Sequence, residues 1–425
     1  MFFERPESGE VAVLVHIVLD SEREQEDPAE FRELVLSAGA QAACFITGSR
    51  KTPDAACFVG SGKLEEIAAA VLEHGAELVL FNHSLSPGQE RNLERALKCR
   101  VLDRTGLILD IFAQRARTHE GKLQVELAQL QHVVTRLKRG WTHLDRQKGG
   151  IGLRGAGETQ LELDQRMIRQ RIKSINKSLL KVRAQRSQGR RSRQRAEIAA
   201  ISLVGYTNAG KSSLFNQLTR SDIYAADQLF ATLDSTIRKL TLPNYGAAVL
   251  ADTVGFISHL PHKLVEAFRA TLEETSQATL LLHVIDCASE QREHCIEQVQ
   301  QVLAEIGADT VPTLEVFNKL DLLPEQEARL ERDEHGKPSR VWVSAVTGAG
   351  LPLLLQAISE LLGQDFVEET LTLTPQQGRL RARLYARGAV ESESMDTEGS
   401  VQLQIRLPRF DYNRLMLEEE IATLG

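Results

Sequence analysis

The chain has 425 residues, enough for about three domains. Hydrophobic residues make up 42%, as in ordinary globular proteins, and no apolar run approaches the roughly 18 residues of a membrane span. The acidic first ten residues are unlike a signal peptide, and five scattered cysteines without CxxC spacing indicate neither a disulfide framework nor a zinc site. We therefore expect the reducing cytoplasm as the compartment. We also expect a monomer.

The charge is unevenly distributed along the chain. The net charge of the whole chain is -7, yet residues 114–195 hold 21 Lys and Arg against 6 Asp and Glu, a net charge of +15. A basic block inside an acidic protein indicates a polyanionic partner. A solvated helical face is the alternative, but the length of the block favours nucleic acid.

Residues 1–104 alternate strand-like and helix-like segments. Buried strands are predicted at 11–19, 41–47, 77–82 and 100–103, with helices between them at 27–39, 62–75 and 86–97. That order predicts a small parallel α/β subdomain. The stretch 58–63, FVGSGK, lacks the full phosphate-loop spacing, so it is interpreted as a helix start, with anion binding as the alternative.

Residues 105–195 predict a basic helical hairpin. Two sets of apolar residues recur at spacings of three and four, and each set marks one stripe on a long helix. The stripes are Leu123, Leu127, Leu130, Val134 and Leu137 on the first arm, and Ile168, Ile172, Ile175, Leu179 and Val182 on the second. From Leu161 to Arg195 the second arm would reach roughly 50 Å, with 183–195 leading to the next domain.

A glycine-rich loop, residues 149–157, separates the two arms. Five glycines in nine residues exclude a helix there. A flexible turn is one interpretation, but two residues would suffice for it. The other is a thin probe that enters a narrow, phosphate-lined space, in which close backbone approach and one charge would contact RNA. The residues predicted to do so are Gly149, Gly150, Gly152, Arg154, Gly155 and Gly157.

A complete phosphate-loop pattern, GxxxxGK[ST], follows the predicted strand at 201–204. Its backbone amides would cradle phosphates, Lys211 would reach the β- and γ-phosphates, and the Ser212 hydroxyl would bind Mg²⁺. The predicted phosphate-binding residues are Gly205, Tyr206, Thr207, Asn208, Ala209, Gly210, Lys211, Ser212 and Ser213.

The stretch Asn318-Lys319-Leu320-Asp321 selects the base. A buried Asp321 carboxylate would accept two hydrogen bonds from guanine, and adenine lacks that donor pair, so ATP would be rejected. Asn318 would brace the phosphate loop, and the Lys319 stem would cover the base. Backbone donors at the end of a predicted strand would complete the pocket, at Ser344, Ala345 and Val346.

Two segments between these motifs are expected to sense the γ-phosphate. The first, switch I, comprises Phe230, Ala231, Thr232, Leu233 and Asp234. Thr232 is the predicted second Mg²⁺ ligand, with Thr236 as the alternative. The second, switch II, comprises Asp252, Thr253, Val254, Gly255 and Phe256. Asp252 would hold Mg²⁺ through water, and the Gly255 amide would face the γ-phosphate.

Two positions bear on mechanism. Phe256 stands where many small GTPases have a glutamine that orients the attacking water, so we expect slow intrinsic hydrolysis that a partner stimulates. Asn208 is either a residue that helps to hold K⁺ beside the phosphates or a plain loop residue.

The C-terminal part from about 366 is predicted as a compact β-α-β unit, with the acidic run 391–399 as a solvated loop.

With these motifs the chain resembles the HflX family of ribosome-associated GTPases over nearly its whole length. The resemblance is carried by the stretches 104–130, 149–164, 205–216, 227–234 and 252–257. It implies an α/β protein with a P-loop GTPase domain (doubly wound sheet), an N-terminal α/β subdomain, a helical hairpin and a small C-terminal α+β domain. Gln165 departs from the arginine expected there, which puts one basic contact in doubt.

The four expected domains are 1–104, 105–195, 196–365 and 366–425. The resemblance implies that GTP or GDP and the large (50S) ribosomal subunit are the partners, that loop 149–157 reaches towards the peptidyl-transferase region, and that stalled 70S ribosomes are split under stress. Two alternatives remain open: an RNA-binding factor whose nucleotide is structural, and a GTPase that regulates a membrane protease. With no span or lipidation motif, the latter is the weaker.

Overall fold

The N-terminal domain is a parallel α/β sheet. In the computed structural model, strands β1 (Val11–Leu19), β2 (Gln41–Arg50), β3 (Leu78–Phe81) and β4 (Arg100–Asp103) lie in the order β2-β1-β3-β4, and every pair is parallel. The structure describes residues 10–20, 27–140, 160–195, 198–220, 229–230, 232–234, 236–243, 245–257, 274–323, 325–363, 366–373, 377–386, 388–395, 401–408 and 412. The predicted parallel sheet is confirmed.

Both faces of this sheet are covered, because alternate residues of β1 enter two different apolar cores. Ala12 and Leu14 pack with α1 (Pro28–Ser37), whereas Val13 and Val15 pack with α2 (Ser61–His74) and α3 (Pro87–Leu97). A strand buried on both sides has a continuous apolar sequence, as seen here. The stretch 58–63 forms the start of α2 with Gly60 as its N-cap, which confirms the helix-start interpretation.

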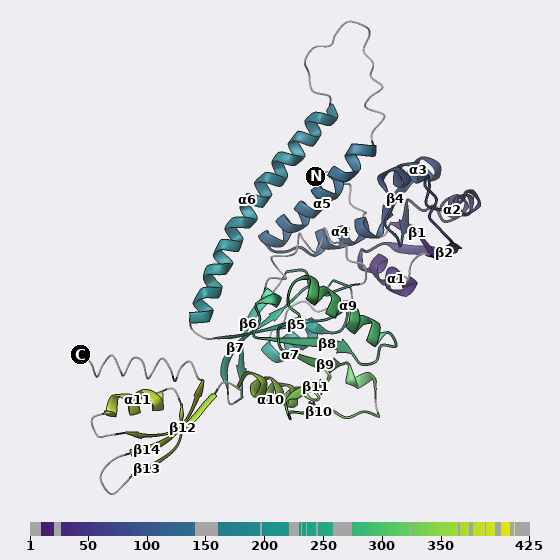
Figure 1. Cartoon of the computed structure of the whole chain (residues 1–425). Helices are drawn as coiled ribbons and strands as arrows, with labels where there is room; N and C mark the ends of the chain where they lie inside the picture. Colours follow the sequence, from purple (N-terminus) through teal and green to yellow (C-terminus); the bar gives the residue numbers. More distant parts are fainter. Residues whose placement is uncertain are drawn as a thin grey trace.

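The hairpin consists of α5 (His119–Gly140) and α6 (Gln160–Arg195), which follow the buried helix α4 (Arg104–Arg115). The two predicted stripes pack against each other; their buried members are Leu123, Leu127, Leu130, Ile168, Ile175 and Leu179. Figure 1 shows α6 lying beside α5 and continuing past it at its C-terminal end. Residues 183–195 belong to α6 and are helical to Arg195, so the expected link is a helix rather than a separate connector. The glycine-rich loop 149–157 lies outside the described residues.

The third unit is a seven-stranded sheet in the order β10-β11-β9-β8-β5-β7-β6. Its central strands are parallel: β7 (Gly246–Asp252), β5 (Ala199–Val204), β8 (Leu280–Asp286), β9 (Thr313–Asn318) and β11 (Pro338–Trp342). The edge strands β6 (Thr236–Leu242) and β10 (Leu330–Arg332) are antiparallel. The helices whose bounds the structure describes are α7 (Lys211–Thr219), α9 (Arg292–Glu305), α10 (Leu351–Leu362) and the 3-10 turn η2 (Leu320–Leu322). In a doubly wound sheet, ligands bind at the carboxyl ends of the strands.

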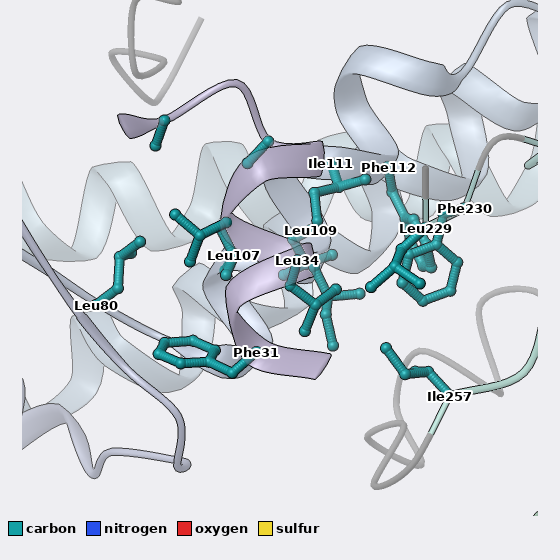
Figure 2. Packing of buried hydrophobic residues seen from close by; sticks show 14 of the residues in the cluster. Phe31, Leu34, Leu80, Leu107, Leu109, Ile111, Phe112, Leu229, Phe230 and Ile257 are labelled. Carbon is teal, nitrogen blue, oxygen red and sulfur yellow. The ribbon is translucent and has the colours of Figure 1, made fainter. Parts of the chain in front are cut away.

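An apolar cluster joins the N-terminal domain to the nucleotide-sensing segments. Figure 2 shows Phe31 and Leu34 of α1 and Phe112 of α4 in the same cluster as Leu229, Phe230 and Ile257. Phe112 and Phe230 meet edge to face, with 4.7 Å between ring centroids. The switch segments therefore pack against a core that the N-terminal domain supplies.

In its described residues, the C-terminal unit is a three-stranded antiparallel sheet with one helix. The sheet order is β12-β14-β13, formed by β12 (Phe366–Leu373), β13 (Val390–Met395) and β14 (Val401–Pro408), and the helix is α11 (Gly378–Ala386). The prediction of a loop at 391–399 is wrong for the residues that β13 contains. Residues 391–394 are exposed, so their polar composition suggests a loop, but pairing with β14 makes them an edge strand.

Candidate functional site: a guanine-nucleotide pocket

The phosphate loop turns tightly between β5 and α7. Gly205 has φ +149°, and a Cβ there would lie 2.3 Å from the Val284 carbonyl oxygen. Gly210 has φ +88°, and its Cβ would lie 2.2 Å from Nδ2 of Asn318. Neither position tolerates a side chain, since both combine a left-handed conformation with a close contact. The loop ends at the N-terminus of α7, where free amides and the helix dipole favour an anion.

Lys211 places a buried cation inside the loop. Its side chain is 6% exposed, and Nζ donates to the carbonyl oxygens of Gly205 at 3.0 Å and Tyr206 at 2.6 Å. Burial lowers the pKa of Lys211 to about 8, and the nearby Asp252 carboxylate opposes this effect. Gly255 approaches the same amine, since a Cβ at Gly255 would lie 3.0 Å from Nζ. An incoming phosphate would therefore meet a desolvated positive charge.

Three oxygen-bearing side chains converge beside Lys211. The Ser212 hydroxyl donates to Oδ2 of Asp252 at 2.8 Å and lies 2.6 Å from the Thr232 hydroxyl. Thr236, the alternative to Thr232, begins β6 instead. Asp252 is fully buried, and its Oδ1 accepts no hydrogen bond from the described residues. Hard oxygen ligands around an unsatisfied carboxylate fit Mg²⁺.

Desolvation raises the pKa of Asp252, while the Ser212 hydroxyl and the Lys211 ammonium act in the opposite direction. A buried carboxylate of this kind gains from any cation that replaces its lost hydration. The residues present therefore fit a divalent cation, with Ser212, Thr232 and Asp252 as the candidates to hold it.

Switch II crosses the phosphate loop as a short parallel pairing. The Thr207 amide donates to the Phe256 carbonyl at 2.7 Å, and the Phe256 amide donates to the Gly205 carbonyl at 3.1 Å. The Phe256 ring is 2% exposed and packs with Val204 and Leu281 of the sheet and with α9. Phe256 therefore anchors switch II in the core and presents no side chain to the phosphates.

The other switch II side chains are also held. Thr253 is fully buried and donates through its hydroxyl to the Leu203 carbonyl at 2.5 Å. Val254 is buried in the cluster that α1 and α4 share. The predicted switch II residues thus lie at one place, where β7 ends beside the phosphate loop.

The base-selecting residues lie at the ends of β9 and β11. Asn318 is the predicted brace: its Nδ2 donates to the Ala209 carbonyl at 2.9 Å, and its Oδ1 accepts from the Ala345 amide at 3.0 Å. The Ala345 amide, expected as a donor to the base, is therefore engaged by Asn318. Lys319 has φ +67°, and its Nζ lies 2.8 Å from Oδ2 of Asp286.

Asp321 differs from the expectation of a buried carboxylate. It is exposed at the pocket wall, and its Oδ1 accepts a hydrogen bond of 2.5 Å from the buried Ser344 hydroxyl. Leu320 is buried beneath it, and Val346 is 74% exposed. Asp321 is exposed because it lies in the surface turn η2, which follows β9 and lines the pocket.

One cavity of about 350 Å³ connects these groups. Its lining combines the phosphate loop, both switch segments and both base-side segments: Thr207, Asn208, Gly210, Lys211, Ser212, Ser213, Phe230, Thr232, Thr253, Gly255, Asn318, Lys319, Asp321, Leu322, Ala345 and Val346. The motifs predicted separately from the sequence are thus brought together around one space. Ala231 and the loop residues 149–157 fall outside the described part of the chain.

Several partners of the site carried no sequence signal. Asp286, which pairs with Lys319, is the last residue of the buried strand β8 and matches no motif. Glu30 of α1 pairs with the buried Arg104 and accepts a hydrogen bond from the Tyr206 hydroxyl of the phosphate loop. Residues 117 and 118 donate to Asp234, a residue of the predicted switch I, in a contact that the sequence did not predict. The contacts of Glu30 and Asp234 join residues that are 74 to 176 positions apart, and Asp286 belongs to no sequence pattern. Only the tertiary structure reveals these partners.

Comparison with known proteins gives a consistent result. Four family models match: GTP-binding GTPase N-terminal over residues 25–113, GTP-binding GTPase middle region over 115–193, 50S ribosome-binding GTPase over 200–319, and HflX C-terminal domain over 329–418. The GTPase HflX of Escherichia coli strain K12 is 60% identical over 417 residues, which cover 98% of each chain. The GTPase HflX of Magnetococcus marinus is 46% identical, over 86% of this chain and 84% of the relative.

Solved structures also match. The crystal structure of a GTP-binding protein from the hyperthermophilic archaeon Sulfolobus solfataricus in complex with GDP is 25% identical, with a TM-score of 0.44, and the match covers 84% of this chain and 99% of that one. Among the described residues, no helix is long and apolar enough to cross a membrane.

Proposed function

This chain belongs to the HflX family of GTPases, and from this membership we propose that it is a GTP-driven factor of the large ribosomal subunit that splits stalled 70S ribosomes under stress. In its GTP state it binds rRNA through the α5–α6 hairpin in the cytoplasm, and hydrolysis releases it. The chain acts as a monomer in this proposal.

The observation that carries the proposal is the combination of one nucleotide pocket with a long basic hairpin. At 1.5 Å per residue, the 36 residues of α6 extend about 54 Å. Its end at Gln160 points away from the sheet that bears the pocket (Figure 1). Lysine and arginine side chains line its solvent face; among its described side chains, the exposed ones are Arg166, Arg169, Arg171, Lys173, Lys177 and Lys181. Such a face suits a phosphate backbone.

In this proposal the phosphates lie on the loop 205–213, with Lys211 at the β- and γ-phosphates and the Gly255 amide at the γ-phosphate. Ser212, Thr232 and Asp252 would hold Mg²⁺, which neutralises charge on the β- and γ-oxygens when bound. Asp321 would accept from guanine N1–H and the 2-amino group, with the Lys319 stem over the base and residues 344–346 at its edge.

Hydrolysis by the isolated protein is slow in this proposal. The Phe256 ring packs in the core, which supports the view that no side chain from this position orients the attacking water. The large subunit would then supply or position the missing group. Asn208 lies on the pocket wall with φ +59°, so its side chain is available to help hold K⁺ beside the phosphates.

The test is GTP turnover by the purified full-length protein, with and without purified large subunits, in KCl and in NaCl. We expect strong stimulation by the subunits, lost when residues 149–157 are deleted, because the loop contacts rRNA in this proposal. An unchanged rate despite confirmed subunit binding would favour a passive RNA-binding role. Equal rates in KCl and NaCl would make Asn208 a plain loop residue.

A further inference from the structure

One carboxylate joins switch I to the base of the hairpin, which comprises residues 117–121 at the start of α5. Oδ2 of Asp234 accepts hydrogen bonds from the backbone amides of Arg117 at 2.9 Å and Thr118 at 2.8 Å. Oδ1 accepts a third from the Thr118 hydroxyl at 2.5 Å. These groups directly precede the first residue of α5, His119. A carboxylate from switch I therefore occupies the anion-favouring end of the first hairpin helix.

The first turn of α5 is shaped to admit this carboxylate. Thr118 caps the helix, since its Oγ1 accepts the Gly121 amide at 2.9 Å. A Cβ at Gly121 would lie 2.0 Å from Oδ1 of Asp234. Glycine is a poor residue in the first turns of a helix, where alanine is favoured. The close approach of Asp234 gives a physical reason for glycine at this position.

The other side of the same segment reaches the metal-fitting cluster. Thr232 is two residues before Asp234, and its hydroxyl lies 2.6 Å from that of Ser212, which is bonded to Asp252. Phe230 and Leu233 are buried in the apolar cluster, Phe230 against Phe112 of α4 (Figure 2). Residues 230 and 232–234 thus contact the pocket, the core and the first turn of α5 together.

We propose that Asp234 is a positioning residue, which holds Thr232 at the Ser212–Asp252 cluster by fastening switch I to the first turn of α5. The apolar contacts of Phe230 and Leu233 keep the segment near α4 in either nucleotide state, whereas the carboxylate fixes its distance from the pocket. The Asp234 contacts also transmit movement in the opposite direction. A partner that moves the base of the hairpin displaces Thr232 from the Ser212–Asp252 cluster. Coupling between two sites is reciprocal in binding free energy.

This inference deepens the proposed function, because it names the connection by which the hairpin and the GTP site influence each other. Switch segments are ordered by contacts with the γ-phosphate and its metal. Loss of the Asp234 contacts should therefore weaken binding of a triphosphate and leave binding of a diphosphate, which the loop 205–213 and the base pocket hold, unchanged.

The test uses two full-length variants, Asp234→Ala and Gly121→Ala. The first removes the acceptor. The second keeps it, improves the helix propensity of α5 and places a methyl group where the carboxylate lies. Matched controls are Asp309→Ala, an exposed aspartate before β9, and Gly88→Ala, a first-turn glycine of α3 where an added methyl group would have no atom within 4 Å. Affinities for a non-hydrolysable GTP analogue and for GDP are measured with Mg²⁺ and without ribosomes.

We expect both variants to bind the GTP analogue about tenfold more weakly, within the usual range of coupling between sites, with GDP affinity changed less than about twofold. Hydrogen exchange at residues 119–125 should differ between the analogue and GDP in the parent protein, and this difference should vanish in both variants. The controls should match the parent protein.

Unchanged analogue affinity in both variants would overturn the proposal. An equal loss for both nucleotides, accompanied by a lower melting temperature, would also overturn it, because it would show a purely structural role. These measurements need no ribosome, so a failure of the parent protein to bind large subunits would refute the proposed function and leave this result standing.

Discussion

The Asn318 carboxamide donates a hydrogen bond of 2.9 Å to the carbonyl oxygen of Ala209, 109 residues earlier in the chain. This single bond ties the base-selecting segment at the end of β9 to the phosphate loop. The same side chain accepts from the Ala345 amide, so Asn318 joins the phosphate loop to both base-side segments of the pocket. Base and phosphate recognition are therefore mechanically linked.

Replacement of Asn318 by alanine should weaken GTP and GDP binding together, by about tenfold or more. The change leaves the Ala209 carbonyl and the Ala345 amide without their partner, and each unmade buried hydrogen bond costs about 1–3 kcal/mol. Titration with fluorescent analogues of both nucleotides measures the effect. Asn92→Ala is the control, since Asn92 also donates to a backbone carbonyl but does so in the N-terminal domain. A loss confined to GTP would contradict the brace.

Asp321→Asn should exchange the preferred base. A carboxylate accepts from the two guanine donors, whereas an asparagine amide matches the carbonyl that xanthine has in place of the amino group. GTP affinity should fall by about 10²-fold or more, because an unpaired polar group at the base discriminates strongly. Xanthosine triphosphate should bind the variant better than it binds the parent. Competition between the two nucleotides checks this, and an unchanged preference for GTP would remove Asp321 from base recognition.

Phe256→Gln should lower stability without accelerating hydrolysis. The Phe256 ring is buried against Val204 and Leu281, so a glutamine there would place a polar amide in an apolar core. Truncation of a buried phenylalanine to alanine costs about 3–5 kcal/mol, and burial of an unpaired amide also costs free energy. Thermal unfolding and GTP turnover are measured on the same sample, with Phe256→Leu as the volume control. A faster turnover in the glutamine variant would mean that residue 256 can reach the attacking water.

His283 should make the protein acid-sensitive. It is buried in β8, and desolvation, assisted by the Lys211 charge, lowers the pKa of His283 to about 4. The unfolded chain, with a pKa near 6.5, binds the proton first, so stability is full above pH 6.5 and is lost as the pH falls towards 4. Between pH 7.5 and 5 the loss from this group is about 2 kcal/mol.

The measurement is the free energy of unfolding in urea at pH 7.5 and pH 5, for the parent protein and for His283→Gln. The variant should lack this part of the pH dependence, whereas His74→Gln, at an exposed histidine, should retain it. Equal pH dependence in the parent protein and His283→Gln would show that other groups cause the acid sensitivity.

The nucleotide-binding segments could be found in the sequence because each is a contiguous stretch that follows a buried strand. Residues 205–212 and 318–321 have residue types that the local backbone requires, such as glycine at positive φ in Gly205 and Gly210. The hairpin was equally visible, since apolar residues at spacings of three and four report on one helix face. Leu127 and Ile175 indeed pack in one cluster between the two arms.

Contacts between distant segments, which no local sequence pattern predicts, were decided by tertiary packing. Residues 391–394 look like a loop by composition, yet their backbone pairs with β14. Asp321 was expected to be buried, but its position in a surface turn leaves it exposed. Asp234 meets Thr118 across 116 positions in the chain. Local periodicity predicts the conformation of one segment. Contacts between segments far apart in the chain depend instead on which surfaces pack together and exclude water.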